Sequence, residues 1–215
     1  LLSFFWQFTQ GEMVAYVFLL FGTMIAAFLL VAPLSTKLGK RDGAILAGAI
    51  SLIVNSGIYF AWIQGFFPGL PGKPSVAWMF GLVFVSNTFS IILMILSSSM
   101  MADVVEASQS ETGRRSEGLF FAGYFFMQKC ATGIGIFAAG MILSFAAFPA
   151  GAEPGQVSNA VLGDLALGYM LSVLVIGIVG LIVMRRFPIS RADHEARLAL
   201  LDDAARAEPD ASGGH

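Results

Sequence analysis

The residues with the clearest chemical potential lie between Gly123 and Gly135, in the stretch GYFFMQKCATGIG, where Gln128 and Lys129 interrupt an apolar run. A lysine near the middle of a membrane helix costs about 2.5–3.5 kcal/mol on insertion scales, so it usually has a function. Its ammonium group can pair with a carboxylate or donate hydrogen bonds to a substrate. The stretch therefore predicts a polar site around Lys129; the alternatives are a purely structural ion pair and a side chain that reaches the membrane surface.

Other residues of the apolar runs are weaker candidates. On a helix, Lys129 shares its face with the residues three and four positions away, which include Phe125, Phe126, Thr132 and Gly133. Several polar residues have a simpler interpretation as hydrogen-bond partners of a neighbouring helix, namely Asn55, Gln64, Asn87, Gln128 and Thr132. Ala131, Gly135 and Ala139 recur every four positions, which predicts close packing of two helices.

Signatures of catalysis and of metal binding are absent from the sequence. His194 and His215 lie in the C-terminal tail, so the apolar runs hold no histidine for a metal cluster or a nucleophile–base pair. The glycines match no phosphate-binding pattern, and Cys130, the single cysteine, cannot form an internal disulfide. We therefore expect no enzyme, no catalytic residue, no metal site, no cofactor and no nucleic-acid partner.

The elements that position Lys129 are predicted to be membrane helices. Of the 215 residues, 57% are hydrophobic and only 12% are charged, and the mean hydropathy is +0.79. The apolar runs reach the length of about 20 residues that a span needs, and they are apolar on all sides. The sequence predicts a polytopic helical membrane protein with spans at 13–34, 44–66, 76–101, 118–148 and 161–184.

The basic residues predict the orientation of these spans. Ten of the twelve lie in the 35–43 loop, the 102–117 loop and the C-terminal segment from residue 185 onward, whereas Lys73 is on the opposite side and Lys129 is within a span. By the positive-inside rule, both loops and the tail are cytoplasmic. We expect a multi-pass protein of the cell membrane, specifically a bacterial inner membrane, surrounded by lipids and with a cytoplasmic, partly disordered tail at 187–215.

Depth indicates where a partner for Lys129 must be sought. Lys129 lies eleven residues into its predicted span, about 16 Å from the cytoplasmic end at 1.5 Å per residue. None of the fourteen acidic residues lies mid-span; those nearest to the spans are Glu12, Asp103, Glu106, Glu117 and Asp164. A partner carboxylate is therefore expected outside this chain. The opening LLSFFWQF is typical of the outer end of another helix, so we expect the back part of a longer protein.

The run MMADVVEASQSETGRRSEGLFFAGYFFMQKCATG, with the basic loop APLSTKLGKRDG, resembles the melibiose permease type of transporter. These are the glycoside–pentoside–hexuronide:cation symporters of the major facilitator superfamily. The resemblance implies an all-α fold in which residues 1–186 form the C-terminal six-helix half of a twelve-helix protein. The first of these helices is truncated, so the chain holds the outer end of helix seven and then helices eight to twelve. The N-terminal half of the same protein would be its partner.

Position by position, the resemblance implies two groups of site residues. Lys129 falls beside the central cavity, and the predicted substrate and cation cavity also includes Tyr124, Phe125, Thr132, Met94 and Asn87. The cytoplasmic gate, which holds the two halves together, is predicted from Asp103, Glu106, Arg115 and Glu117. Met94 replaces an aromatic residue of the melibiose permease, and Tyr124 and Phe125 replace polar ones. These replacements imply a substrate other than a galactoside, and a less polar one.

The resemblance implies cation-coupled symport of a sugar, a glycoside or a related small organic solute by alternating access. The coupling cation, Na⁺ or H⁺, would be bound mainly by the N-terminal half. Two other classes remain open: a transporter of lipids or other amphipathic solutes, and a membrane scaffold or sensor that does not transport.

Overall fold

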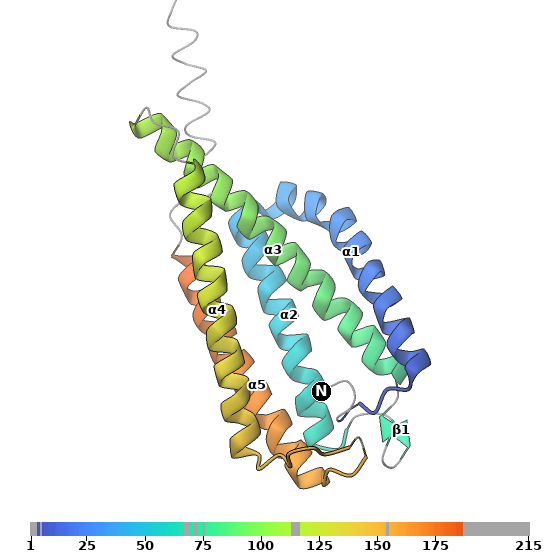
Figure 1. Cartoon of the computed structure of the whole chain (residues 1–215). Helices are drawn as coiled ribbons and strands as arrows, with labels where there is room; N and C mark the ends of the chain where they lie inside the picture. The colour runs from blue at the N-terminus through green and yellow to red at the C-terminus, as the bar shows by residue number, and fades with distance from the viewer. Residues whose placement is uncertain are drawn as a thin grey trace, which may run out of the picture.

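The computed structural model describes residues 4, 6–66, 69–70, 73–74, 76–112, 117–153 and 155–186. Within these ranges the helices are α1 (Gln10–Leu38), α2 (Lys40–Ile63), α3 (Val76–Thr112), α4 (Glu117–Phe145) and α5 (Asn159–Arg185). The two-residue strands β1 (Gly69–Leu70) and β2 (Lys73–Pro74) pair antiparallel. The helices run alternately in opposite directions through one bundle (Figure 1). We call the end with the α1–α2 corner the inner end and the opposite end the outer end, after the predicted orientation.

All five described helices are long and apolar enough to cross a membrane, which confirms the five predicted spans. One prediction about their length was wrong, because α3 continues as a helix to Thr112 instead of ending at 101. Most of the predicted 102–117 loop is therefore helical. The charges of ADVVEASQSE end the apolar segment, but this run contains no glycine or proline and is rich in residues compatible with a helix.

Local signals in the sequence set the helix ends. Thr9 and Glu12 form a capping box at the start of α1, with the Thr9 amide donating to the Glu12 carboxylate at 2.7 Å. Gly39 alone separates α1 from α2, and its φ of +81° is a conformation that favours glycine. Pro33 lies in the last two turns of α1, and Figure 1 shows that this helix is bent near its inner end.

The residues that precede α1 were expected to form the outer end of another helix, but the described ones are not helical. The described residues among them, 4 and 6–9, are not helical, and Gln7 has a left-handed backbone with φ of +50°. Trp6 and Phe8 are 2% and 8% exposed and belong to one buried cluster. Residues two apart point to nearly opposite sides of a helix, so a helix over these residues would not bury both side chains in one cluster.

Two hydrophobic clusters hold the bundle together. Both are built around α2, which packs against α1, α3 and α5. The outer cluster consists of Trp6, Phe8, Ile58, Tyr59, Met79, Val157, Leu162, Ala166 and Met170. The inner cluster consists of Ala27, Ala44, Ala47, Ile92, Leu96 and Met100.

Glycines allow α2 and α5 to approach closely. A Cβ atom on Gly48 would lie 2.8 Å from Leu181 of α5, and one on Gly177 would lie 2.6 Å from Leu52 of α2. Each of the two helices thus places a leucine side chain against a glycine of the other helix. Such small residues are the usual means of close helix contact in membranes.

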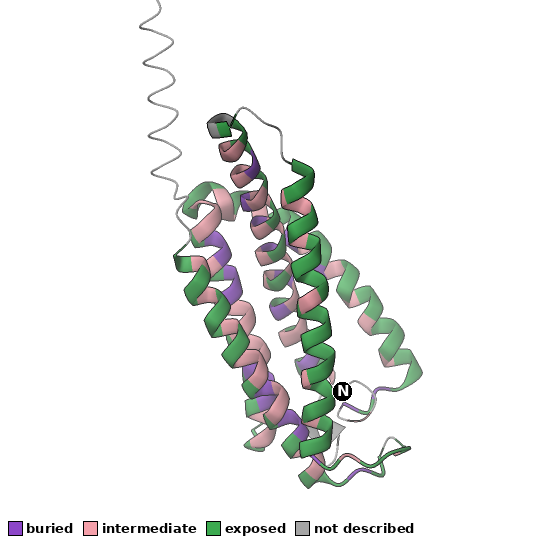
Figure 2. Cartoon of the chain, turned by 60° about the vertical axis from the view of Figure 1, so that its left-hand side comes forward, coloured by how far each residue is buried: buried purple, intermediate pink, exposed green. Residues whose placement is uncertain are grey.

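By contrast, α4 lies at the edge of the bundle. None of its residues is buried, and Figure 2 shows it exposed along nearly its whole length. The predicted packing stripe of Ala131, Gly135 and Ala139 is exposed, and a Cβ on Gly135 would meet no described atom within 4 Å. The described helices therefore do not use this stripe for close packing.

Candidate functional site

Lys129 lies near the middle of α4, twelve residues after Glu117, the first residue of the helix. At 1.5 Å per residue this is about 18 Å along the helix axis. The side chain is exposed, and within the described part of the chain it makes no hydrogen bond or ion pair. Ile142 of α4 packs where Gly168 of α5 has no side chain. At about 100° per residue, Lys129 lies about 140° around α4 from Ile142, so it points away from α5.

Two of the predicted cavity residues on α4, Phe125 and Thr132, share the open face of Lys129. Phe125 is 57% exposed and Thr132 is also exposed. The Thr132 hydroxyl donates to the backbone carbonyl of Gln128 at 2.9 Å, which leaves its oxygen able to accept a further hydrogen bond. Tyr124 lies about 140° around α4 from Lys129, on the side of Ile142, where it is half-buried; its ring lies 5.7 Å from that of Phe125 in a T-shaped arrangement. This face thus offers one charged group among aromatic and small side chains.

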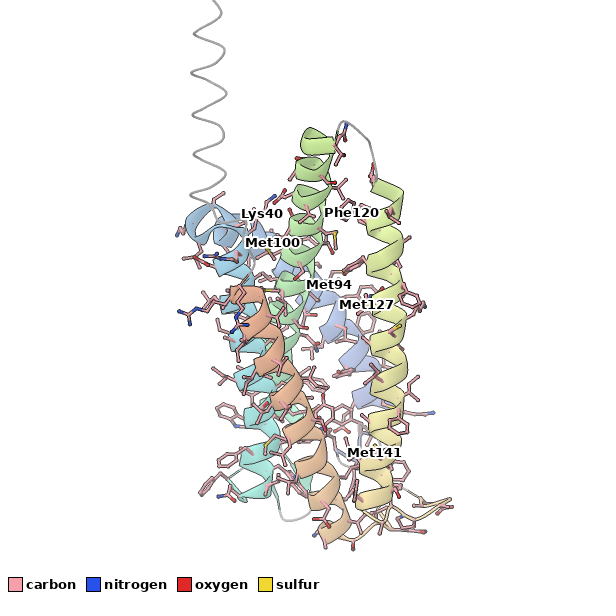
Figure 3. The ribbon with its side chains drawn as sticks, turned by 90° about the vertical axis from the view of Figure 1, so that its left-hand side faces the viewer. Lys40, Met94, Met100, Phe120, Met127 and Met141 are labelled. Atoms are coloured by element: carbon pink, nitrogen blue, oxygen red, sulfur yellow. The ribbon has the colours of Figure 1, made fainter. Side chains whose placement is uncertain are left out.

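The remaining predicted cavity residues, Asn87 and Met94, are on α3. They are seven residues apart and so lie on one face of that helix; Asn87 is half-buried and Met94 is 56% exposed. Figure 3 places Met94 at a height in the bundle similar to that of Met127 on α4. Among the described residues, no hydrogen bond joins Asn87 or Thr132 to Lys129. The predicted cavity residues are therefore shared between α3 and α4 without direct polar contact.

Of the predicted gate residues, Asp103 has a clear partner. Lys40 at the start of α2 donates to both of its carboxylate oxygens, at 2.6 and 2.8 Å. The two side chains are 40% and 31% exposed. Glu106 lies about one turn further along α3 and Glu117 begins α4, and both are exposed. Arg115 lies outside the described residues. The Lys40–Asp103 pair connects the α1–α2 corner to the inner part of α3.

Sequence reasoning did not single out Lys40 as a site residue. It appeared only as one of several basic residues of the 35–43 loop, although it is the first residue of α2. Its partner is 63 positions away, and no periodicity connects two positions so far apart. The nearest signal was Gly39, which marks a tight corner and hence a fixed position for the residue after it.

A second polar group that sequence reasoning missed lies in the outer half of the bundle. The rings of Tyr59 on α2 and Tyr169 on α5 are 4.8 Å apart, and the Asn55 amide interacts with the Tyr169 hydroxyl. Trp6 covers Tyr59, with ring centroids 6.3 Å apart. Asn55 was predicted to hydrogen-bond a neighbouring helix; it lies next to Tyr169 of α5, but its buried Oδ1 accepts no hydrogen bond from a described residue.

Comparisons with known proteins agree with a bundle of membrane helices. The model of the family described as MFS/sugar transport protein matches residues 1–191. An uncharacterized symporter of Synechocystis is 30% identical over 129 residues, which cover 58% of this chain and 23% of that relative. No solved structure matches the chain. The chain belongs to the MFS/sugar transport protein family.

Proposed function

We propose that this chain is part of a secondary active transporter of the melibiose permease type, which couples the movement of a small organic solute to that of a cation. The observation that carries the proposal is Lys129, at mid-depth on the α4 face that points away from α5. An ammonium group at this depth is unfavourable next to lipid and is found where it faces a polar interior. Lys129 therefore lines a cavity in the complete protein.

The coupling cation, Na⁺ or H⁺, needs carboxylates near the cavity. The acidic residues of the described helices are Glu12, Asp42, Asp103, Glu106, Glu111, Glu117 and Asp164, and all lie nearer to a helix end than Lys129 does. We therefore assign the cation-binding carboxylates to the N-terminal half of the protein. In this arrangement Lys129 holds those carboxylates in position, or donates hydrogen bonds to the substrate, or does both.

Alternating access supplies the mechanism. Two helical halves rock about a site near the membrane midplane and open to one side at a time. The inner charges Asp103, Glu106, Arg115 and Glu117 close the cytoplasmic side when the cavity opens outward. This requires the inner end and the C-terminal tail to be cytoplasmic in a bacterial inner membrane, as the basic residues predict.

The substrate class follows from the surfaces that α3 and α4 present. A sugar or glycoside fits the family description, and its hydroxyl groups are suitable partners for Lys129 and Thr132. The exposure of Met94 (56%) and Phe125 (57%) favours a second candidate, an amphipathic solute or lipid whose apolar part contacts these side chains. A scaffold or sensor without transport is the remaining alternative, and nothing in the geometry of the described residues favours it.

Measurements of uptake test the role of Lys129. The substitution Lys129→Ala in the full-length protein should abolish cation-driven uptake while the protein still inserts in the membrane. The reason is that carboxylates left without their ammonium partner are no longer held in the protonation state and position that coupling needs. Uptake is measured in membrane vesicles with and without a Na⁺ or H⁺ gradient, at matched expression, over a panel of sugars, glycosides and lysolipids.

The matched control is Gln128→Ala, which changes the adjacent polar side chain on a different side of α4 and should retain most of the uptake. Gradient-driven uptake by Lys129→Ala at the rate of the unchanged protein would show that the lysine is structural. Absence of uptake of every solute by the unchanged protein, at normal expression, would favour the scaffold or sensor.

A further inference from the structure

Three arginines meet where the inner ends of α2 and α5 come together. Arg41 is in the first turn of α2, and Arg185 and Arg186 end α5. Met184, the residue before Arg185, packs against the inner cluster, which includes Ala44, about one turn after Arg41. Figure 3 shows the inner end of α5 beside the corner between α1 and α2. We call these three residues the inner arginines.

The faces of the two helices bring Arg41 and Arg185 to the same place. At about 100° per residue, Arg41 lies within about 20° of Gly48, the residue of α2 against which Leu181 of α5 packs. Arg185 lies about one turn after Leu181 and about 40° around α5 from it. Both arginines therefore continue the α2–α5 contact toward the inner end, one from each helix.

The positive charge at this place is only partly compensated by the described residues. Arg41 Nε donates to the Asp42 carboxylate at 3.2 Å, and the Asp42 side chain is 61% exposed. Arg185 and Arg186 are exposed, and their side chains make no ion pair or hydrogen bond with a described residue. The first amides of α2 add partial positive charge, since Gly39 has no side chain to cap them. The inner arginines therefore form a site that attracts an anion.

The helix surfaces next to the inner arginines are apolar. Ile178 and Ile182 of α5, seven and three residues before Arg185, are 49% and 52% exposed. Ile178 lies within about 20° of Arg185, on the same face of α5. Ile45 of α2, four residues after Arg41, is half-buried. An anion with an apolar chain fits this arrangement, because its charge meets guanidinium groups while its chain lies along isoleucines.

We propose that the inner ends of α2 and α5 bind the phosphate group of an anionic phospholipid through Arg41 and Arg185. A guanidinium group binds phosphate oxygens through two parallel hydrogen bonds, and basic sites between membrane helices suit lipid headgroups. One phosphate held by both arginines connects α2 to α5, so the bound lipid stabilises the contact between these helices. A free phosphate ion would use the arginines but not the isoleucines. The inference does not depend on the proposed transport function.

Lipid binding to the full-length protein tests the proposal. Native mass spectrometry during a lipid titration in detergent gives the apparent dissociation constant of the first bound lipid. Phosphatidylglycerol should bind more tightly than phosphatidylcholine, whose headgroup also carries a positive charge. Arg41→Gln and Arg185→Gln should each weaken binding of phosphatidylglycerol about fivefold, which is the contribution of one basic residue near an anionic lipid surface. Neither substitution should alter binding of phosphatidylcholine.

The matched control is Arg197→Gln, which removes the same charge from the C-terminal tail and should leave the binding of both lipids unchanged. An equal loss with Arg197→Gln would show that only net charge matters, and this would refute the site. Unchanged binding in both Arg41→Gln and Arg185→Gln would also refute it, because the arginines would then contact only water and the end of α5. Inorganic phosphate should not displace phosphatidylglycerol at an equal concentration; displacement would show a site for free phosphate instead.

Melting temperatures in lipid nanodiscs provide a second measurement. The unchanged protein should melt at a higher temperature in phosphatidylglycerol than in phosphatidylcholine, and Arg185→Gln should reduce this difference. An equal difference in the variant would contradict the proposed link between α2 and α5. Arg185 is exposed, so this variant retains the test even if Arg41→Gln does not fold. Neither measurement requires transport, so failure of the lipid site and failure of the proposed function are distinguishable.

Discussion

At the scale of single residues, Lys40 shows how one charge can fix a corner of the fold. It is the first residue of α2, where a positive charge is unfavourable because the N-terminal end of a helix already carries a partial positive charge. Its two hydrogen bonds to Asp103 compensate for this position. They also connect α3 to the corner at Gly39, so Asp103 has a role inside this chain in addition to the gate role that we propose.

The strength of this pair can be measured with a double-mutant cycle. Lys40→Ala and Asp103→Ala should each destabilise the protein, and the coupling between them should be about 0.5–2 kcal/mol, because the pair is neither fully exposed nor fully buried. The exchanged pair, Lys40→Asp with Asp103→Lys, should recover most of the stability. Thermal unfolding in detergent provides the readout, with Arg41→Ala as a control at the same corner. A coupling of zero, with no recovery by the exchange, would show that the pair does not hold the corner.

At the scale of elements, α1, α2, α3 and α5 form a packed unit in which α2 contacts the other three, and α4 lies at its edge. At the reciprocal leucine–glycine contacts, α2 and α5 leave no room for a Cβ atom on Gly48 or Gly177. In a membrane, association of helices depends on van der Waals packing rather than on the hydrophobic effect. The stability of the unit should therefore be sensitive to volume at these glycines.

The substitution Gly177→Ala tests this sensitivity. Its Cβ would lie 2.6 Å from a methyl carbon of Leu52, so α2 and α5 must separate or repack, at a cost of about 1–3 kcal/mol. Gly180→Ala, one turn further along α5, meets nothing within 4 Å and should be neutral or slightly stabilising, because alanine favours a helix. Melting temperatures of the two variants provide the comparison. Equal values would show that the α2–α5 contact tolerates an added methyl group.

At the scale of the whole molecule, the sequence predicts the helices better than it predicts their contacts. Runs of about 20 apolar residues identify spans because backbone groups in a membrane must be satisfied within a helix. The same reasoning failed for residues 102–112, since leaving the membrane ends a hydrophobic run but not a helix. The Lys40–Asp103 pair depends on how helices pack, which hydropathy does not encode. Lys129 was predicted as a site residue because the free-energy cost of a lysine within a membrane span can be judged from sequence alone.

The orientation of the molecule is the last prediction, and it depends on the loops taken together. Ten of the twelve basic residues lie at the inner end or in the tail, so Thr112 should be cytoplasmic and Gly155 extracytoplasmic. Both residues are exposed, and each can be replaced by cysteine in a Cys130→Ala background. An impermeant maleimide added to intact cells should label Gly155→Cys, whereas Thr112→Cys should react only after the cells are opened. The reverse labelling pattern would show that the orientation in the membrane is the opposite one. The Lys40–Asp103 pair would then be outside the cell, and there would be no basis for a cytoplasmic gate.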